Sequence, residues 1–595
     1  MKARGQVLSE AKRVAPDLNR KKAKNPERVQ FEDGISRTTD SCLTSHQSPS
    51  PTLSIGFIPE RSMPMNDSKY YLRPNVMFEP LFNQWYAWPL LIAPHTAAMN
   101  IANLHLTIMQ SYVSAPQIHA NAVKNPALLG GPFIDYDSNR VSDINALITR
   151  TTKEQSHLLE FADSVKRLDQ ILKSQAQGYS LESLYSTVPE NLRGYVELVY
   201  DLNNNPAIRY LEGLLYRSKY YDPRLQSISM SLIEEDGRAF ALSTPRLPDE
   251  TKLQWQIPFA DERIDMLFAL RNEPQLYHQI VERLRLEPNE EEIFKTFLTE
   301  EVPPSQSRYE GDGIRLRYFG HACVLLETSE VSIMTDPAIS YRYQTGIDRY
   351  TFMDLPPRID YVLITHSHQD HVMFESLLQL RHKIGTVVVP RSRGGSLEDP
   401  SLKLILKHLG FQNVIELEEM EQLDIAGGSI TGLPFLGEHA DLNIGSKIAH
   451  LIKLKEKTFL FAADSNNLEP ALYKHIYDIL GEVNILFLGM ECEGAPMSWL
   501  YGPLMLTNLD RRMDQSRRLC GSNYEKGLDI VNQFNCSEVY VYAMGQEPWL
   551  TYALSIKYTE ESKPIIASNK LLETCSSRGI TAERLFGKKE SFYLN

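Results

Sequence analysis

One stretch restricts the fold of this chain more than any other, residues Tyr361–Val372, which read YVLITHSHQDHV. Three histidines and an aspartate follow directly after an apolar run: His366, His368, Asp370 and His371. Where a buried strand ends in a turn, residues i and i+2 can reach one metal ion, and residues i+4 and i+5 a second ion about 3.5 to 4 Å away. The stretch therefore predicts half of a dinuclear metal site at a strand end.

The composition is that of a globular protein with more than one domain. The chain has 595 residues, too many for a single core, and 42% of them are hydrophobic and 23% charged. No apolar run approaches the ~18 residues that a membrane span needs, so no membrane contact is expected. A net charge of −13 disfavours a nucleic-acid partner, because phosphate binding needs a basic surface. Six cysteines without C-x-x-C spacing indicate neither a disulfide framework nor cysteine-bound zinc, so a reducing, cytoplasmic location is expected.

Shifts in composition divide the chain into three segments. Residues 1–65 are basic and lack an apolar signal core, so we expect a disordered tail and linker, or a true start at Met63 or Met65. Residues 66–305 are predicted to form a separate mixed α/β domain, which ends at a linker near VPPSQS. Residues 306–595 contain the histidine-rich stretch and are predicted to form the metal domain.

The segment 66–305 shows secondary-structure signals but no catalytic spacing. An apolar stripe predicts a helix over 153–175, the pair Asp236-Gly237 predicts a β-hairpin turn, and another helix is expected over 261–285. Four isolated histidines in this segment are expected to be ordinary core or surface residues: His95, His105, His119 and His157.

The pattern changes after residue 313. Two strands joined by a turn at residues 328–330 are predicted over 314–337, and a buried strand leads into the histidine-rich stretch. Helical and extended segments then alternate as far as NILFLGM. This order predicts a sandwich of sheets flanked by helices, with the chemistry at the strand ends.

The histidine-rich stretch resembles the signature H-x-H-x-D-H of the metallo-β-lactamase superfamily. The resemblance implies an α/β fold, the αββα sandwich, with further metal ligands at three later strand ends. The carboxylate expected to bridge the metals fits Asp464 in FLFAADSNN. For the next position, LGEHADLN offers Glu438 or His439.

The last expected ligand cannot be a histidine, because none occurs after His475. The segment ECEGAP offers Glu491 or Glu493 in its place. Zinc hydrolases favour nitrogen-rich sites that activate a water molecule. Carboxylates add negative charge and hard oxygen donors, which suit iron, and mixed histidine and carboxylate ligands are typical of diiron proteins. The donor set therefore predicts redox chemistry.

Over about Tyr70 to the C-terminus the chain resembles the dinuclear-iron β-hydroxylases of nonribosomal peptide pathways. The resemblance rests on the spacing of the metal motif, on Glu438 and Asp464, and on WYAWP and NPALLGGPFID in the leading domain. It implies an oxygen-dependent monooxygenase that hydroxylates the β-carbon of an amino acid tethered to the phosphopantetheinylated carrier domain of a synthetase. It also implies two iron ions (Fe²⁺/Fe³⁺), O₂ and an external reductase as electron donor. We further expect a homodimer whose leading domain contributes the dimer contact and docks the carrier.

Carried over position by position, the resemblance implies a complete set of ligands. The residues implied for the two irons are His366, His368 and Glu438 on one, Asp370 and His371 on the other, Asp464 as the bridge, and Glu491 or Glu493 as the last ligand. Glu438 and Asp464 are the residues assigned to catalysis. The signature also fits a zinc- or manganese-dependent hydrolase of a phosphodiester, lactone or thioester, which is the alternative function.

Two further groups of side chains are candidates for substrate contacts. Aromatic residues near the strand ends are candidates for the wall of a channel: Trp499, Tyr501 and Trp549. A basic cluster is a candidate docking site for an acidic carrier, or else a solvated helix: Arg511, Arg512, Arg517 and Arg518.

Overall fold

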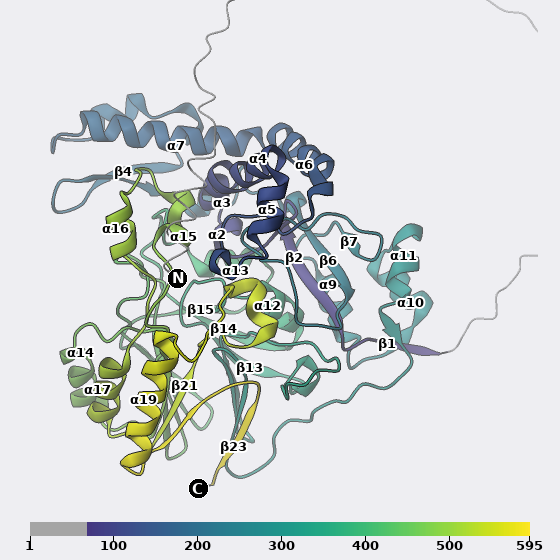
Figure 1. The fold of residues 1–595 in the computed structure, drawn as a ribbon, viewed down its shortest axis with the longest axis vertical. Coiled ribbons are helices and arrows are strands. Elements are labelled where there is room, and N and C mark those ends of the chain that lie inside the picture. The colour runs from purple at the N-terminus through teal and green to yellow at the C-terminus, as the bar shows by residue number, and fades with distance from the viewer. Residues whose placement is uncertain (1–67, 595) are drawn as a thin grey trace, which may run out of the picture.

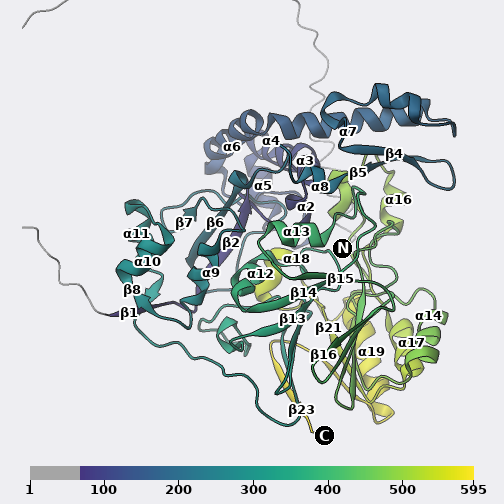
Figure 2. The ribbon, with the colours of Figure 1, turned by 180° about the vertical axis from the view of Figure 1, so that it is seen from behind.

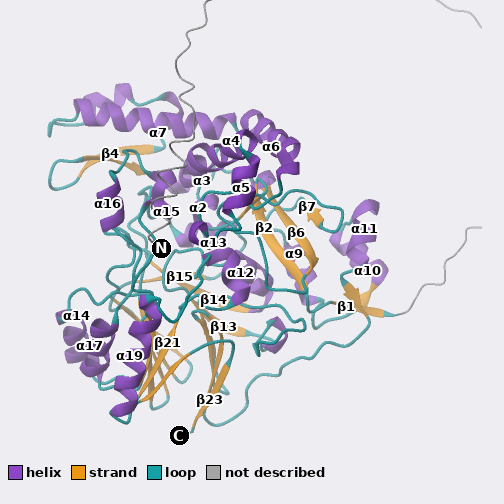
Figure 3. Ribbon diagram, viewed as in Figure 1, coloured by secondary structure: helices purple, strands orange, loops and turns teal. Residues whose placement is uncertain are grey.

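The computed structural model describes residues 68–594. The predicted tail and linker of residues 1–65 lie outside the described residues. A helix-rich N-terminal part occupies the upper half of Figure 1, and a part built on two large sheets occupies the lower half. Figure 3 shows the strands gathered in that lower half, with a smaller sheet on the right.

The N-terminal part contains two small antiparallel sheets and one hairpin. The sheet orders are β3-β2-β6-β7 and β8-β1-β9, and β4 pairs with β5. The strands are β1 (Lys69–Leu72), β2 (Val76–Phe82), β3 (Trp85–Tyr86), β4 (Val196–Tyr200), β5 (Pro206–Tyr210), β6 (Gln226–Leu232), β7 (Leu253–Trp255), β8 (Gln275–Leu276) and β9 (Leu298–Thr299). Strand β2, with the sequence VMFEPLF, is buried along its whole length, and its one charged side chain, Glu79, is paired with Arg238 and Arg246.

Helices cover these sheets. They are α2 (Pro89–Ile92), α3 (Pro94–Asn100), the π-helical turn η1 (Ile101–His105), α4 (Leu106–Ser114), α5 (Pro116–Ala122), α6 (Val141–Glu154), α7 (Ser156–Gln175), α8 (Glu212–Leu215), α9 (Glu262–Ala269), α10 (Tyr277–Leu284) and α11 (Pro288–Lys295). Short 3₁₀ turns are η2 (Pro126–Leu128), η3 (Ser138–Arg140), η4 (Glu182–Thr187), η5 (Glu190–Leu192) and η6 (Pro223–Leu225).

The C-terminal part contains two seven-stranded sheets. The first has the order β15-β14-β13-β12-β11-β10-β23 and the second β16-β17-β18-β19-β20-β21-β22. The first consists of β10 (Ile314–Gly320), β11 (Cys323–Glu327), β12 (Ser332–Thr335), β13 (Ile359–Leu363), β14 (Ile384–Pro390), β15 (Val414–Leu417) and β23 (Lys589–Tyr593). The second consists of β16 (Gln422–Ile425), β17 (Gly428–Leu433), β18 (Ala449–Leu454), β19 (Lys457–Phe461), β20 (Ile485–Gly489), β21 (Glu538–Tyr542) and β22 (Thr581–Arg584).

The two sheets pack face to face and helices cover their outer faces. Side chains of both inner faces form one core, among them Leu326, Ile333, Ile452 and Phe487. Figure 2 shows the second sheet with its covering helices from behind. The helices of this part are α12 (Phe374–Leu380), α13 (Leu402–His408), α14 (Ala471–Leu480), α15 (Ser498–Tyr501), α16 (Arg511–Ser516), α17 (Tyr524–Phe534), α18 (Thr551–Leu554) and α19 (Lys563–Ser577), with 3₁₀ turns η7 (Phe352–Asp354), η8 (Arg381–Lys383), η9 (Gly502–Leu504) and η10 (Pro548–Leu550). The result is an αββα sandwich.

The N-terminal part packs against the first sheet through α12 and α13. One continuous hydrophobic core joins Phe78 and Leu91 of the N-terminal part to Leu377 and Ile405 of these two helices. The two parts therefore share a core, although a strand-free segment, residues 300–313, connects them in sequence.

Most of the expected elements are present. The stripe over 153–175 lies on α7, where Leu158, Phe161, Val165 and Leu168 are buried. The turn at residues 328–330 joins β11 to β12, and β13 leads into the histidine-rich stretch. The four isolated histidines of the N-terminal part take no part in any of the potential metal-binding groups found within residues 68–594.

Three of the expected elements were wrong. The first of the two strands expected over 314–337 is in fact two antiparallel strands, β10 and β11, because the chain reverses at residues 320–322. The segment after Asp236-Gly237 does not form the second strand of a hairpin, because β6 is already paired with β2 and β7 on its two edges. The helix expected over 261–285 is two helices, α9 and α10, separated by a turn that contains Pro274. Proline disfavours helical geometry in the residue before it, which explains the break.

No helix within residues 68–594 is both long and apolar enough to cross a membrane.

Candidate metal centre

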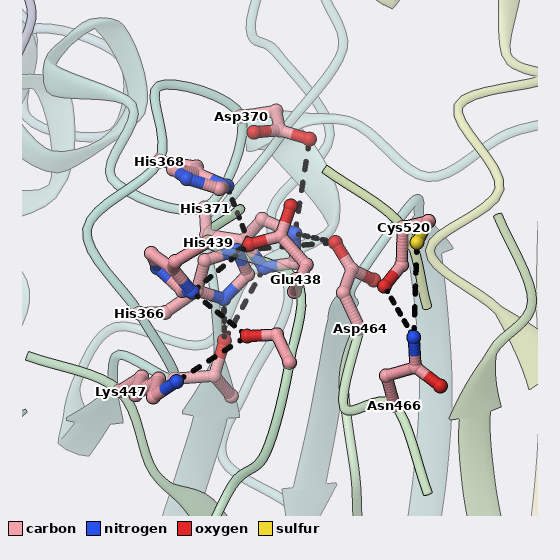
Figure 4. A network of polar contacts seen from close by, with 12 residues as sticks. His366, His368, Asp370, His371, Glu438, His439, Lys447, Asp464, Asn466 and Cys520 are labelled. Carbon is pink, nitrogen blue, oxygen red and sulfur yellow. Dashed lines mark hydrogen bonds and ion pairs between the residues drawn. The ribbon is translucent and has the colours of Figure 1, made fainter. Parts of the chain in front are cut away.

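The predicted ligands meet at one edge of the sandwich. His366, His368, Asp370 and His371 follow the end of β13, Glu438 follows β17, and Asp464 follows β19. Figure 4 shows these side chains converging from the loops above the two sheets. Residues that follow three strands, one in the first sheet and two in the second, thus reach a common point.

The first group of potential ligands consists of His366, His368 and Glu438. Glu438 Oε2 lies 3.0 Å from His368 Nδ1 and 3.9 Å from His366 Nε2. All three side chains are buried. One carboxylate oxygen therefore faces two imidazole nitrogens, an arrangement that suits coordination of a single ion.

Asp464 lies between this group and the other two predicted ligands, Asp370 and His371. Its Oδ2 atom is 3.8 Å from His366 Nε2 and 3.2 Å from His371 Nε2. Asp370 Oδ2 lies 3.7 Å from the same nitrogen of His371. The position of Asp464 suits a carboxylate that bridges two ions.

The two glutamates of ECEGAP lie in different surroundings. Glu491 lines a cavity of about 40 Å³ together with His368, Glu438 and Asp464. The Glu493 carboxylate instead forms an ion pair of 2.7 Å with Lys563, at a partly exposed position. Of the two, only Glu491 faces the other predicted ligands.

His439, the alternative to Glu438, takes no part in the potential metal-binding groups of the described residues. Its Nδ1 atom lies 3.2 Å from Glu438 Oε2 and 3.4 Å from the carbonyl oxygen of Gly437. Gly437 has φ +73°, and a Cβ atom there would lie 2.5 Å from Asn466 Cβ. The His439 ring packs against the His368 ring, with 4.4 Å between their centroids, but only Glu438 of the two belongs to a potential ligand group.

Several donor atoms of the predicted ligands are buried without a good hydrogen bond, which bound metal ions would replace. Three buried donor atoms have no well-aligned hydrogen bond within residues 68–594, although Glu438 Oε2 lies 3.0 Å from His368 Nδ1: His366 Nε2, Glu438 Oε2 and Asp464 Oδ1. Each such atom costs about 1 to 3 kcal/mol if nothing binds it. Burial raises the pKa of Glu438 to about 7 although His368 opposes the rise, and burial together with His371 lowers the pKa of His366 well below its usual value. Bound cations would satisfy all three atoms and stabilise the ionised carboxylate.

Outer residues orient two of the histidines. The His371 Nδ1–H donates to Asp336 Oδ2 at 2.8 Å, and both the backbone N–H and the hydroxyl of Thr365 donate to the same carboxylate. This leaves His371 Nε2 free to bind a metal. The Tyr501 hydroxyl lies 3.0 Å from His368 Nε2 and so fixes the other imidazole. Asp336 was not predicted from the sequence, although a carboxylate directly after a buried strand is a signal for such a role.

The three candidate aromatic residues have different surroundings. Trp499 lines the cavity beside the ligands, and its indole N–H donates to Gly130 of the N-terminal part at 2.9 Å. Tyr501 contacts His368 as described above. Trp549 packs instead against Gly320, whose added Cβ atom would lie 2.8 Å from its ring. Only Trp499 lines the cavity next to the ligands.

The arginine cluster is split by the fold. Arg511 and Arg512 lie on α16 and are exposed. The Arg517 side chain donates to the carbonyl of Ala440, and Arg518 donates to the carbonyl of Gly494. Arg517 and Arg518 therefore hold the loops that carry Glu438 and Glu491, and the four arginines do not share one helix.

Comparisons with known proteins decide the family. A family model described as the diiron non-heme β-hydroxylase N-terminal domain matches residues 71–303, and a β-lactamase superfamily domain matches residues 332–495. The 4-amino-L-phenylalanyl-[CmlP-peptidyl-carrier-protein] 3-hydroxylase of Streptomyces venezuelae is 39% identical over 526 residues, which cover 87% of this chain and 98% of that protein. The chain belongs to the diiron non-heme β-hydroxylases.

A solved structure agrees with this membership. The crystal structure of CmlA, a diiron β-hydroxylase from Streptomyces venezuelae, matches this β-hydroxylase with a TM-score of 0.83 and 37% identity, over 88% of this chain and all of that one. A metal-dependent hydrolase from Oenococcus oeni is 34% identical over only 58 residues, or 10% of this chain and 23% of its own length. The predicted fold class, a metallo-β-lactamase αββα sandwich preceded by a mixed α/β domain, is confirmed. A hydroxylase is favoured over the hydrolase alternative.

Proposed function

We propose that this β-hydroxylase is an oxygen-dependent dinuclear-iron monooxygenase that hydroxylates the β-carbon of an amino acid tethered to a nonribosomal peptide synthetase carrier domain. The observation that carries the proposal is the identity of 39% along nearly the whole length of a relative named for hydroxylating a carrier-bound amino acid. The mixed donor set of imidazoles and carboxylates supports iron as the metal. The proposal includes O₂, an external reductase and a cytoplasmic location.

The proposed ligands of one iron are His366, His368 and Glu438. Those of the other are Asp370, His371 and Glu491, and Asp464 is the proposed bridge. Two iron ions held by these residues would supply the activation of O₂, with electrons from the external reductase. Glu438 and Asp464 are the proposed catalytic ligands, because Glu438 faces both imidazoles of the first ion and Asp464 lies between His366 and His371, the imidazoles proposed for different ions.

Other residues of the cavity orient the substrate and exclude water. Apolar side chains that line the cavity beside the ligands are Ala495, Trp499, Leu500, Leu519, Leu554 and Ile556. Gln369 lines the same cavity; its amide N–H donates to the Ala553 carbonyl at 3.5 Å, and its amide oxygen has no hydrogen-bond partner within residues 68–594. That oxygen can accept an N–H of the tethered amino acid. Tethering through the carrier arm raises the effective concentration of the reacting carbon.

The test is a reaction with isotopically labelled oxygen. Iron-loaded protein, a chemical reductant and a carrier domain loaded in turn with different amino acids are incubated under ¹⁸O₂, and the released amino acid is analysed by mass spectrometry. We expect one labelled oxygen atom on the β-carbon for at least one amino acid, and none with the free amino acid or with zinc-loaded protein. Cleavage of the thioester by zinc-loaded protein, without oxygen incorporation, would favour the hydrolase instead.

We also propose that residues 66–305 form the domain that docks the carrier and provides a homodimer contact, and that residues 306–595 form the metal domain. The chain has a mass of 68.0 kDa, so light scattering after size-exclusion chromatography is expected to give about twice that mass. A monomer mass across the accessible concentration range would contradict the dimer.

A further inference from the structure

The turn between β10 and β11 contains His321, a residue that the sequence analysis did not predict to be functional. The segment RYFGHACVLL reads as one apolar run, but the chain reverses at Gly320, His321 and Ala322. Gly320 has φ +114° and leaves no room for a side chain beside Trp549. His321 itself has φ +51°, which is uncommon for a residue with a Cβ atom.

Contacts from a distant loop hold His321 in this conformation. Its backbone N–H donates to Glu547 Oε1 at 3.1 Å, and its carbonyl accepts from the backbone N–H of Ala543 at 2.9 Å. Glu547 is buried and also accepts the hydroxyl of Tyr318. Hydrogen bonds at both its N–H and its carbonyl thus hold His321 in an unfavourable left-handed conformation. Such strained residues are frequent at functional sites.

The imidazole of His321 points at a predicted metal ligand. Its Nε2 atom lies 3.1 Å from Asp370 Oδ2, and its ring centre lies 4.9 Å from that of His371. The side chain is only 2% exposed. A carboxylate accepts hydrogen bonds and does not donate them, so a hydrogen bond at this distance places the imidazole proton on Nε2.

We propose that His321 is a positioning residue for the second metal ion, which it orients through a hydrogen bond from Nε2–H to Asp370. The proposal rests on the metal centre of the proposed function. A carboxylate oxygen has more than one lone pair, so Asp370 can accept this hydrogen bond and bind the ion at the same time. Without the imidazole, the carboxylate would be free to rotate away, since no other side chain of residues 68–594 is hydrogen-bonded to it. Outer partners of this kind are worth about 10- to 100-fold in metal affinity.

The test compares two substitutions that differ in the donor. His321→Gln and His321→Leu have similar volumes and the same left-handed backbone cost, but only glutamine has an N–H that can donate to Asp370. We expect His321→Leu to bind one iron as the wild type does and the second about 10- to 100-fold more weakly, and His321→Gln to keep most of the second affinity. The readouts are iron titration of the metal-free protein and the rise in Tm that iron produces in each variant.

A control separates this role from simple loss of packing. His119 is buried in the N-terminal part and hydrogen-bonded to Ser111 and Ile134. His119→Leu is expected to lower the Tm of the metal-free protein without changing either iron affinity. Wild-type affinity for both irons in His321→Leu would overturn the proposal, and so would an equal loss in His321→Gln and His321→Leu.

A measurement on the wild type keeps the proposal testable if the variants fold poorly. X-ray absorption of the iron-loaded protein is expected to give three imidazoles for the iron pair, from His366, His368 and His371. A fourth imidazole would show that His321 binds the metal directly and would overturn a role through Asp370. These readouts need no substrate, so the inference can fail while hydroxylation stands, and absence of hydroxylation would leave the iron affinities unaffected.

Discussion

Glu438→Ala is expected to lower the affinity for one of the two metal ions by more than about 100-fold. This loss exceeds the about 10- to 100-fold that follows removal of a residue that only hydrogen-bonds to a metal ligand. Glu438 Oε2 is the carboxylate atom that faces both His366 and His368, so its removal leaves two imidazoles without the third donor. An incomplete donor set binds its ion weakly. Metal analysis of the purified variant is therefore expected to give about one iron per chain, with Mössbauer spectra that lack the coupled pair.

His439→Ala is the matched control, because His439 lies on the same turn and is also buried. It is expected to retain both irons. Glu438→His is expected to bind zinc better relative to iron and to lose oxygen-dependent hydroxylation, since imidazole favours zinc and a carboxylate favours iron. If His439→Ala loses a metal while Glu438→Ala keeps both, the two residues have been assigned the wrong way round.

Glu375→Leu is expected to destabilise the protein by about 3 to 5 kcal/mol, because it removes one of the two carboxylates that pair with the buried Arg238 and leaves three tyrosine hydroxyls without this acceptor. Glu375 lies on α12 and is 3% exposed. Its carboxylate accepts two hydrogen bonds from Arg238, at 3.0 and 2.8 Å, and three from tyrosine hydroxyls: Tyr86, Tyr341 and Tyr552. Arg238 also pairs with Glu79 of β2, so this network ties the N-terminal part to the metal domain.

The measurement is the Tm and the free energy of unfolding of the metal-free protein in urea. Glu375→Gln is expected to lose less than Glu375→Leu, since an amide oxygen still accepts from the tyrosines. Arg209→Ala removes the exposed ion pair with Glu197 and is expected to cost less than about 1 kcal/mol. If Glu375→Leu costs no more than this surface control, the buried network does not hold the two parts together.

Local patterns predicted the elements near the metal centre well. The apolar run before His366 is β13, and the spacing of the histidine-rich stretch brought all four of its side chains to one site. The predictions failed where pairing was not local. The residues Asp236-Gly237 have a turn signal, but the preceding strand β6 pairs with β2 and β7 and has no free edge for the segment that follows. Arg238 of that segment instead forms an ion pair with Glu375. A turn signal reports backbone preference and contains no information about which edges are free.

The sequence by itself was enough to predict the family and the αββα fold, because the resemblance rests on a contiguous metal motif and the strand ends follow from apolar periodicity. It left open the choice between Glu491 and Glu493, which are two residues apart in the same loop. The tertiary structure places the first against the ligand cavity and pairs the second with Lys563. Asp336 and His321 reach the site from turns that precede the motif by 30 residues or more, and Tyr501 from a helix far beyond it. Such contacts depend on how the sheets pack and on the direction of each side chain, and no spacing along the chain encodes either.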